Sequence, residues 1–262
     1  MNRTGIEWCE YTWNPIVGCS PASEGCANCY ARRMARRLAA NPKLPVTTRF
    51  AYGLALADDG REWARPACLM LLPERLGEPA RVKKPARIFV CSMSDLGHES
   101  VSPGRRQEVV DAMIRAPWHT YIVLTKRPGP WMRDLPKACW VGVTAENQAR
   151  ANERIPELLH HGAYAEVRFA SVEPMLGPVD FEGLVLNGVC LDRLDWVIAG
   201  PETGPGAREF RYEWIWSLSE SCRVARVPFF DKRKTSLLLR EWPEDLRAGR
   251  VARPGRETTR KE

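Results

Sequence analysis

The sequence predicts an α/β protein built around a parallel β-sheet. From residue 87 onward, short apolar runs alternate with polar turns and helix-like stretches about six times, which is typical of repeated strand–helix units. Each run is almost wholly apolar instead of alternating, as expected of strands that helices cover on both faces. Hydrophobic residues make up 44% of the 262 positions, so the chain can supply a packed core and disorder throughout is excluded.

The strands are expected where β-branched and aromatic residues cluster between turns. They lie at 11–17, 87–92, 119–125, 139–144, 166–171, 195–200 and 227–231. Helices are expected at about 29–40, 103–116, 129–134, 147–161 and 212–226. This alternation leaves two architectures open, an open doubly wound sheet and a closed or partial barrel.

The strand–helix pattern predicts a single domain over residues 1–240. Residues 41–86 do not fit a strand–helix unit, and we expect a Pro-rich, basic insertion there with one helix near 67–76. Residues 241–262 are expected to form a basic, disordered tail, because they are rich in charge, Gly, Pro and Thr.

The chain is basic, with 39 Lys and Arg against 32 Asp and Glu and a net charge of +7. Part of the excess lies in the tail and part in four arginines at helical spacing, namely Arg32, Arg33, Arg36 and Arg37. Helix and tail are candidate contacts for nucleic acid, although a solvated face explains them as well. No run reaches the roughly 18 apolar residues of a membrane span, and residues 1–14 lack the apolar core of a signal peptide. We therefore expect a cytoplasmic protein with no membrane partner.

Polar side chains follow nearly every predicted strand. In parallel α/β folds the carboxyl ends of the strands converge on one edge, where active sites form. Helix caps and polar loops explain one or two such clusters, but acidic, basic and hydroxyl groups after nearly every strand favour a functional site. The candidates are Ser92, Ser94, Asp95, Lys126, Glu146, Asn147, Glu173, Gly200, Glu202 and Gly204.

Three cysteines, Cys19, Cys26 and Cys29, lie close together in the loop GCSPASEGCANCY. Their C-x6-C-x2-C spacing allows the thiols to converge. A structural zinc needs four ligands, and no other cysteine or histidine has a paired spacing relative to this loop. A four-iron cluster on three thiolates leaves one iron open for a substrate or cofactor. The residues favour this cluster, with zinc and reduced structural thiols as alternatives.

Several segments, in the same order, resemble the phage Gp37/Gp68 (DUF5131) family of three-cysteine-motif proteins. The resemblance covers most of residues 6–232. It is carried by TWNPIVGC, GCANCYA, IFVCSMSDLGHE, LTKRP, VGVTAENQ, ERIPELL, SVEPMLGPVD, DWVIAG, ETGPGAR and VPFFDK. That family is in turn similar to the radical S-adenosylmethionine (radical SAM) enzymes.

The resemblance implies a partial (β/α)6 TIM-like barrel of the radical SAM type. It also implies a [4Fe-4S] cluster on the three cysteines, with the open iron taking the amino and carboxylate groups of S-adenosylmethionine. Reductive cleavage of the sulfonium would start radical chemistry on a nucleotide, nucleic acid or small metabolite, with an electron donor as partner. The chain departs from the pattern in two places: radical SAM enzymes usually have C-x3-C-x2-C, and Pro201 lacks an N–H for a ligand.

Under this hypothesis the first strand ends would bind S-adenosylmethionine. Ser92, Ser94 and Asp95 are candidates for its amino group, because they combine two hydroxyls with an anion. Glu146 and Asn147 are candidates for the ribose hydroxyls, which carboxylates and amides can bind.

The later strand ends supply the remaining candidates. Gly200 and Gly204 would let the adenine approach the backbone closely. Lys126 suits a carboxylate or phosphate of the substrate, and Glu173 and Glu202 are candidate anchors, so these three are the expected catalytic residues. Two other functions stay open: a zinc-stabilised, non-catalytic nucleic-acid-binding protein, and a barrel enzyme that uses the Glu and Lys side chains for acid–base chemistry.

Overall fold

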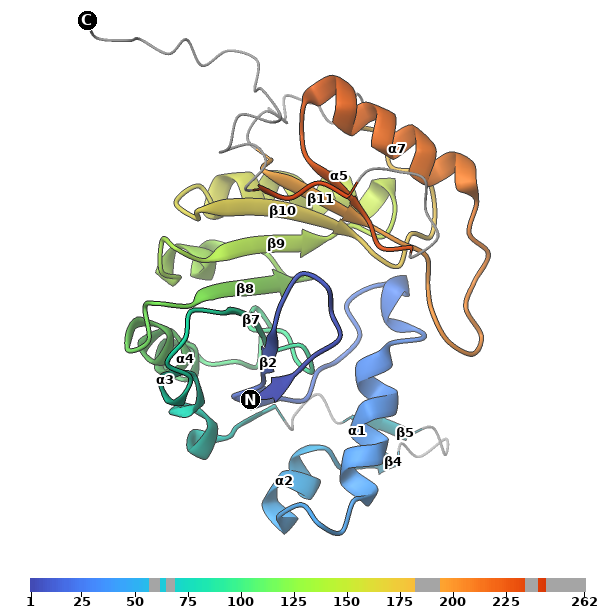
Figure 1. Ribbon diagram of the computed structural model, residues 1–262. Coiled ribbons are helices and arrows are strands. Elements are labelled where there is room, and N and C mark those ends of the chain that lie inside the picture. Colours follow the sequence, from blue (N-terminus) through green and yellow to red (C-terminus); the bar gives the residue numbers. More distant parts are fainter. Residues whose placement is uncertain (57–61, 65–68, 182–193, 234–239, 244–262) are drawn as a thin grey trace, which may run out of the picture. The chain divides into compact units, whose positions relative to one another are not determined.

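The computed structural model describes residues 1–56, 62–64, 69–181, 194–233 and 240–243. The protein is a mixed α/β fold with a mostly parallel eight-stranded sheet in the order β1-β2-β7-β8-β9-β10-β11-β12 (Figure 1). These strands are β1 Asn2–Arg3, β2 Tyr11–Trp13, β7 Arg87–Val90, β8 Thr120–Thr125, β9 Trp140–Thr144, β10 Val167–Val172, β11 Trp196–Ala199 and β12 Phe229–Asp231. The chain divides into two compact units, a first unit of residues 1–142 and 161–166 and a second unit of residues 143–160 and 167–262.

The order of the strands bears on the two architectures that the sequence leaves open. From β2 to β12 the neighbours in the sheet follow the order of the chain, whereas a doubly wound sheet reverses its order at a switch point. The pairs β2–β7, β7–β8, β10–β11 and β11–β12 are parallel, and β1 is antiparallel to β2. The parallel α/β prediction is therefore confirmed. Among the described residues no strand pair closes the sheet into a barrel.

The predicted strands from residue 87 onward all form, with ends that differ by a few residues. Every residue of β9 and of β11 is buried, and so are three of the four residues of β7. Strands buried on both faces are built from continuous apolar runs, which is why the sequence identifies them.

The expected strand over residues 11–17 is divided in two. β2 ends at Trp13, and the separate strand β3, Ile16–Val17, pairs antiparallel with β6, Met70–Leu71. Pro15 stands at the break, and proline has no N–H to donate to a strand ladder. The chain thus leaves the main sheet just before the cysteine loop.

Helices and short 3-10 turns complete the first unit. The helix α4 begins where the Ser102 hydroxyl accepts a hydrogen bond from Arg105 N at 3.4 Å, with Pro103 in the first helical position. The predicted helix over 129–134 is a 3-10 turn. The elements are α1 Tyr30–Ala40, α2 Val46–Ala51, α3 Glu78–Arg81, α4 Pro103–Ile114, η1 Glu24–Cys26, η3 Pro73–Arg75 and η4 Pro130–Asp134.

The insertion at 41–86 contains α2, the hairpin of β4, Leu54–Leu56, and β5, Glu62–Ala64, then β6, η3 and α3. In Figure 1, α1 runs beside α2 and this hairpin. The predicted helix near 67–76 is wrong in its described part, which holds β6 and the turn η3. Pro73 begins that turn, and proline cannot lie inside a longer helix without removing a hydrogen bond.

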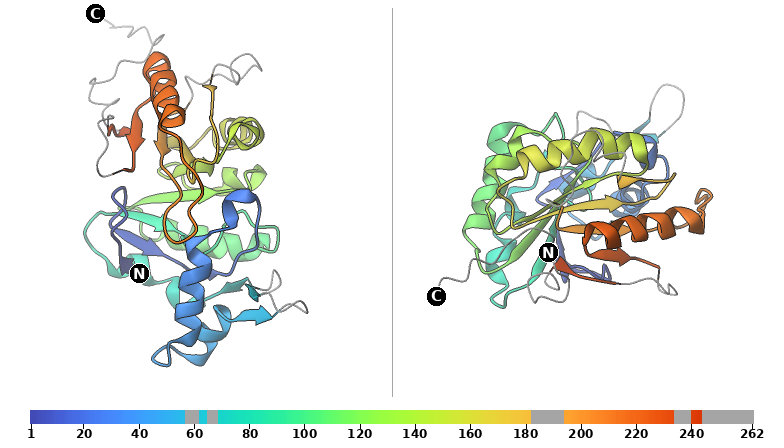
Figure 2. Two further views of the ribbon diagram at one scale, coloured as in Figure 1. Left: turned by 90° about the vertical axis from the view of Figure 1, so that its right-hand side faces the viewer. Right: turned by 90° about the horizontal axis from the view of Figure 1, so that it is seen from above.

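The second unit holds α5, Gln148–His161, and α7, Tyr212–Ala225, with β10 to β12. Figure 2 shows α7 running beside β12. Its strands carry an aromatic core in which Trp196 contacts Phe169 and Phe230 and stacks on Trp242 with ring centroids 5.5 Å apart. Of the tail predicted at 241–262, only residues 241–243 are among the described residues.

Within the part of the chain that the structure describes, no helix combines the length and the apolar character needed to cross a bilayer.

Candidate metal centre

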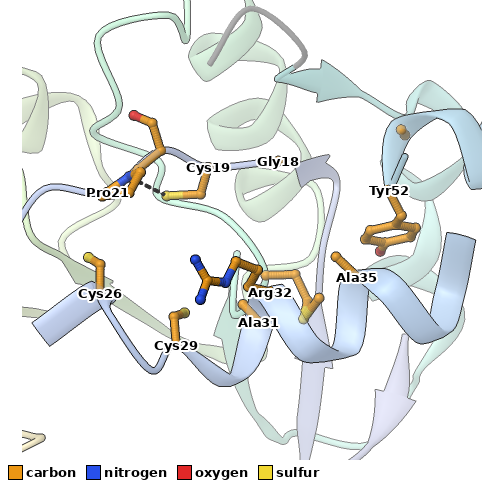
Figure 3. A pocket seen from close by; sticks show the side chains of 12 residues that line it. Gly18, Cys19, Pro21, Cys26, Cys29, Ala31, Arg32, Ala35 and Tyr52 are labelled. Atoms are coloured by element: carbon orange, nitrogen blue, oxygen red, sulfur yellow. Dashed lines mark hydrogen bonds between the residues drawn. The ribbon is translucent and has the colours of Figure 1, made fainter. Parts of the chain in front are cut away.

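Cys19, Cys26 and Cys29 line one pocket in the first unit (Figure 3). The structure thus brings the three thiols of the loop to one cavity. The rest of the wall is mainly apolar and consists of Gly18, Ser20, Pro21, Ala31, Arg32, Ala35, Ala51, Tyr52 and Met93.

Each cysteine lies at a turn or at the end of an element. Cys19 follows Gly18, whose φ of +91° is a left-handed conformation that glycine adopts without steric cost. Cys26 ends the turn η1, and Cys29 is the residue that caps the N-terminus of α1. The main-chain N–H of Cys29 donates to the carbonyl of Cys26 at 3.2 Å. The short gap of the C-x2-C pair is therefore a tight turn that leads directly into a helix.

The sulfur atoms of the loop make hydrogen bonds within the chain. The main-chain N–H of Ala22 donates to Cys26 Sγ at 3.4 Å, and hydrogen bonds to sulfur tune iron–sulfur clusters. Burial, reinforced by Asp95 and the other two thiols, raises the pKa of Cys19 to about 12. Without metal Cys19 is thus a thiol, and it donates to the Ser20 carbonyl at 3.4 Å. A bound metal ion would favour the thiolate form of Cys19 over the thiol, because a metal deprotonates a coordinating thiol.

Cys19, Cys26 and Cys29 are the residues of this pocket that could hold a metal or a cluster. No histidine and no fourth cysteine lines the pocket among the described residues. Over the same described ranges, no three His, Cys, Asp or Glu side chains are grouped as ligands of a single metal ion. Zinc gathers four ligands around one ion, whereas the thiolates of a cluster bind separate irons and stand farther apart.

The hydroxyls of Ser92 and Ser94 join the end of β7 to the segment that carries the cysteines. Ser94 Oγ donates to the Gly18 carbonyl at 2.6 Å, and the same two residues form a parallel β-bridge. Ser92 Oγ donates to Asn14 Oδ1 at 3.3 Å, and this amide oxygen also accepts from Met93 N at 2.8 Å. Both predicted cofactor-binding hydroxyls therefore hold the start of the cysteine loop against β7.

The Asp95 carboxylate is buried and ties the end of β7 to the end of β8. Its Oδ1 accepts from Gly97 N at 2.9 Å and from Thr125 Oγ1 at 2.5 Å. Its Oδ2 accepts from Lys126 N at 3.0 Å and from Arg127 Nη1 at 3.4 Å. Lys126, predicted to contact substrate, thus contributes its main chain to this network, and its side chain is half-buried.

Arg127 connects this network to the cysteine loop. Its Nη2 donates to both the carbonyl and the hydroxyl oxygen of Ser20 at 3.1 Å, and its Nε donates to Glu99 at 2.8 Å. The buried His98 places Nε2 2.7 Å from Ser20 Oγ and accepts from Ser100 N at Nδ1, 3.0 Å away. Burial and the Arg127 charge lower the pKa of His98, so the ring is neutral and carries its proton on Nε2.

In the second unit, Glu146 and Asn147 serve the connection from β9 to α5. Glu146 is fully buried and pairs with Arg154 at 2.9 Å. Arg154 also donates to the Thr144 carbonyl at 2.8 Å. Asn147 Oδ1 accepts from Arg150 N at 3.1 Å, which satisfies an N–H of the first helical turn. Their predicted contact with ribose stays a prediction.

Glu173 pairs with Lys232 at 2.8 Å beside Gly200. A Cβ atom at residue 200 would lie 2.9 Å from Glu173 Oε1, so this glycine allows close approach of the carboxylate. The predicted contact of Gly200 with adenine stays a prediction.

The turn after β11 carries the last two candidates. Glu202 pairs with Arg208 at 2.5 Å, and Gly204 has a φ of +94°, which favours glycine. The ion pair occupies both oxygens of Glu202. The second unit thus places Glu173 and Glu202 in separate ion pairs.

The sequence analysis singles out the three cysteines, which the structure places at one pocket, but not Asn14 and Ser20, which hold the loop, or Tyr52, which also lines the pocket. Asn14 and Ser20 act through partners more than 70 residues away, and nothing local in the sequence reports such contacts. The available signal is position, since Ser20 directly follows Cys19 and Asn14 precedes Pro15.

A family model described as "Protein of unknown function (DUF5131)" matches residues 3–251. No curated protein and no solved structure matches the chain.

Proposed function

The chain belongs to the DUF5131 family of proteins of unknown function, and we propose that it is a radical SAM-like iron–sulfur enzyme. In this proposal Cys19, Cys26 and Cys29 hold a [4Fe-4S] cluster, and S-adenosylmethionine is the cosubstrate. The observation that carries the proposal is the pocket that three thiols line without a fourth cysteine or a histidine among the described residues. Three thiolates leave one iron of such a cluster open to a cofactor.

The strand order supports the fold that this function requires. A partial barrel places parallel strands next to one another in chain order, and the strands from β2 to β12 follow that order. The cysteine loop comes after the first parallel strand, β2, as in the radical SAM pattern. We therefore propose a partial barrel for this sheet.

When bound, the cluster supplies the electron that cleaves a carbon–sulfur bond of S-adenosylmethionine. The chain's own residues hold the cysteine loop in place and exclude water. Gly18 and Cys19 are fixed to β7 through Ser94, and Ser20 is fixed to β8 through Arg127. The apolar wall, with Ala35 as one member, limits the water that could quench reactive species. Orientation and exclusion of water are the protein's contribution in cofactor enzymes.

The polar strand ends are proposed to bind the cosubstrate and substrate. Ser92, Ser94 and Asp95 lie next to the cysteine loop and are proposed for the amino group of the cosubstrate. Lys126 is the proposed contact for an anionic group of the substrate.

The second unit supplies the other proposed contacts. Glu146 and Asn147 are proposed for the ribose, Gly200 and Gly204 for the adenine, and Glu173 and Glu202 for the substrate. Glu146 forms a buried ion pair with Arg154. We therefore propose that its carboxylate positions the residues around the ribose. We propose the cytoplasm as the compartment, since none of the described cysteines forms a disulfide and a cluster needs reduced thiols.

The test is cleavage of S-adenosylmethionine by full-length protein that is reconstituted with iron and sulfide under anaerobic conditions. With dithionite as electron donor, we expect methionine and 5′-deoxyadenosine, and we expect their formation to stop in the C26A and C29A variants. The matched control is C139A, which removes a buried thiol outside the pocket and should retain activity. A colourless protein with one zinc per chain, or unchanged cleavage after removal of all three cysteines, would reject the proposal.

A further inference from the structure

The helix that follows Cys29 carries a continuous basic face. Arg32 and Arg36 form one row at i, i+4 spacing, and Arg33 and Arg37 form the next. From residue 30 to residue 43 the chain contains no Asp or Glu. The positive charge of α1 is therefore not balanced by acidic residues on the helix itself.

The basic face is separate from the face of α1 that packs on the rest of the first unit. The opposite face of α1 packs through Ala31, Ala35 and Leu38 against a buried cluster of the first unit that includes Tyr52 and Met93. Like charges at i, i+4 destabilise a helix.

Arg33 and Arg37 are exposed, and within the described ranges they have no ion pair or hydrogen bond. Guanidinium groups that cost helix stability and have no partner among the described residues are available for an external anion.

The basic face is continuous with the cysteine pocket. Arg32 belongs to both, and Figure 3 shows its guanidinium beside Cys29 at the start of the helix. Two large side chains next to the arginines are exposed, Tyr30 at 49% and Met34 at 38%. The Tyr30 hydroxyl donates to the Ser92 carbonyl, and its partly exposed ring lies one turn before Arg33. An exposed aromatic ring can stack on a planar base while neighbouring cations bind phosphates.

We propose that the substrate of the cysteine pocket is a single-stranded nucleic acid whose phosphates bind the arginine rows of α1. The proposal rests on the proposed function, because it supplies the substrate class of the same site. Arginine binds phosphate through paired N–H groups. A membrane surface is the less suitable partner, because a helix that binds in a bilayer interface buries a broad apolar face, and the apolar face of α1 is already packed.

The first test is the binding of a fluorescein-labelled 15-nucleotide single-stranded RNA or DNA of mixed sequence to the full-length protein. We expect the R33Q/R37Q double variant to raise the dissociation constant at least tenfold and to reduce the slope of log K against log salt by about 1.4, at about 0.7 per phosphate contact on single strands. The matched control is R115Q/K137Q, which removes the same charge from two exposed positions elsewhere in the first unit and should change affinity less than twofold. Equal effects of the two double variants would overturn the proposal.

The second test places the bound strand at the pocket. In metal-free protein, the oligonucleotide should slow the alkylation of Cys26 and Cys29 by N-ethylmaleimide at least threefold, and this protection should be absent in R33Q/R37Q. Binding without protection, or tighter binding to phosphatidylserine vesicles than to the oligonucleotide, would overturn the proposal. Iron content separates the two claims: protected, arginine-dependent binding by a protein that takes up no iron would reject the proposed enzyme, whereas an iron-loaded protein whose affinity R33Q/R37Q does not change would reject only the nucleic-acid substrate.

Discussion

Ser20 is the residue through which the cysteine loop is attached to the ends of two strands. Its hydroxyl lies between the Arg127 guanidinium and the His98 ring, at 3.1 and 2.7 Å. Arg127 is in turn held by the buried Asp95. A chain of polar contacts of this kind fixes the position of the cysteine loop, because each member restricts the next.

Gly97 packs closely against the segment that carries Arg127 and Trp131, and this packing leads to a prediction for its replacement by alanine. A Cβ atom there would lie 2.4 Å from the Arg127 carbonyl oxygen and 2.7 Å from Trp131 Cζ2. We expect G97A to lower the free energy of unfolding by about 2–3 kcal/mol through overpacking, measured by urea denaturation.

The control for this prediction is G104A in the first turn of α4. No atom lies within 4 Å of a Cβ atom at that position, so alanine should raise stability by about 0.5–1 kcal/mol. Equal effects of the two substitutions would show that Gly97 is not tightly packed.

The neutral state of His98 predicts a pH dependence. Burial and Arg127 lower its pKa from the usual value of 6.5, so the folded protein binds this proton less readily than the unfolded chain does. The stability that depends on neutral His98 is present above pH 6.5 and is lost as the pH falls toward the lowered pKa. We expect the urea midpoint to fall between pH 7 and pH 5.5, and to fall less in H98Q. H160Q, which alters an exposed histidine, should keep the wild-type decrease, and an equal decrease in H98Q would contradict the account.

Local sequence carries only part of the site. The C-x6-C-x2-C spacing indicates that the three thiols can converge, and the structure places all three at one pocket. The roles of Ser20 and Asn14 depend on strand ends that are distant in the sequence, so no local pattern predicts them. Asp95 was expected to bind a ligand. The sequence did not predict the four hydrogen bonds that its carboxylate accepts within the chain.

At the scale of elements, the strands were predictable because burial on both faces requires continuous apolar runs. The errors fall where proline acts on a short segment. Pro15 divides the expected first strand, and Pro73 begins a 3-10 turn where a helix was expected. The composition of residues 67–76 does not predict the pairing of β6 with β3, because this pairing is a contact between segments distant in the sequence.

The C-terminus of α7 supplies an element-scale prediction. Arg226 follows the helix with a φ of +53°, a left-handed conformation that costs a non-glycine residue free energy. We expect R226G to raise the free energy of unfolding by about 0.5–1 kcal/mol, measured by urea denaturation.

Its matched control is R223G, one turn earlier within α7. Glycine inside a helix loses more backbone entropy on folding than other residues do, so this variant should be less stable than the wild type. The account of the cap fails if R226G is also destabilised.

At the scale of the molecule, the alternation of strands and helices predicts a parallel sheet but not its strand order. Doubly wound sheets and barrels share that pattern, and the resemblance to a family was needed to favour a partial barrel. The chain-order arrangement from β2 to β12 depends on which strand edges meet, and this is set by side-chain packing between distant segments.

The most direct measurement of the central claim is the content of iron, acid-labile sulfide and zinc in anaerobically purified full-length protein. The account predicts about four irons and four sulfides per chain, lost in C19A/C26A/C29A and retained in C139A. A chain that binds one zinc and no sulfide, or that keeps its iron after the three cysteines are removed, would contradict it.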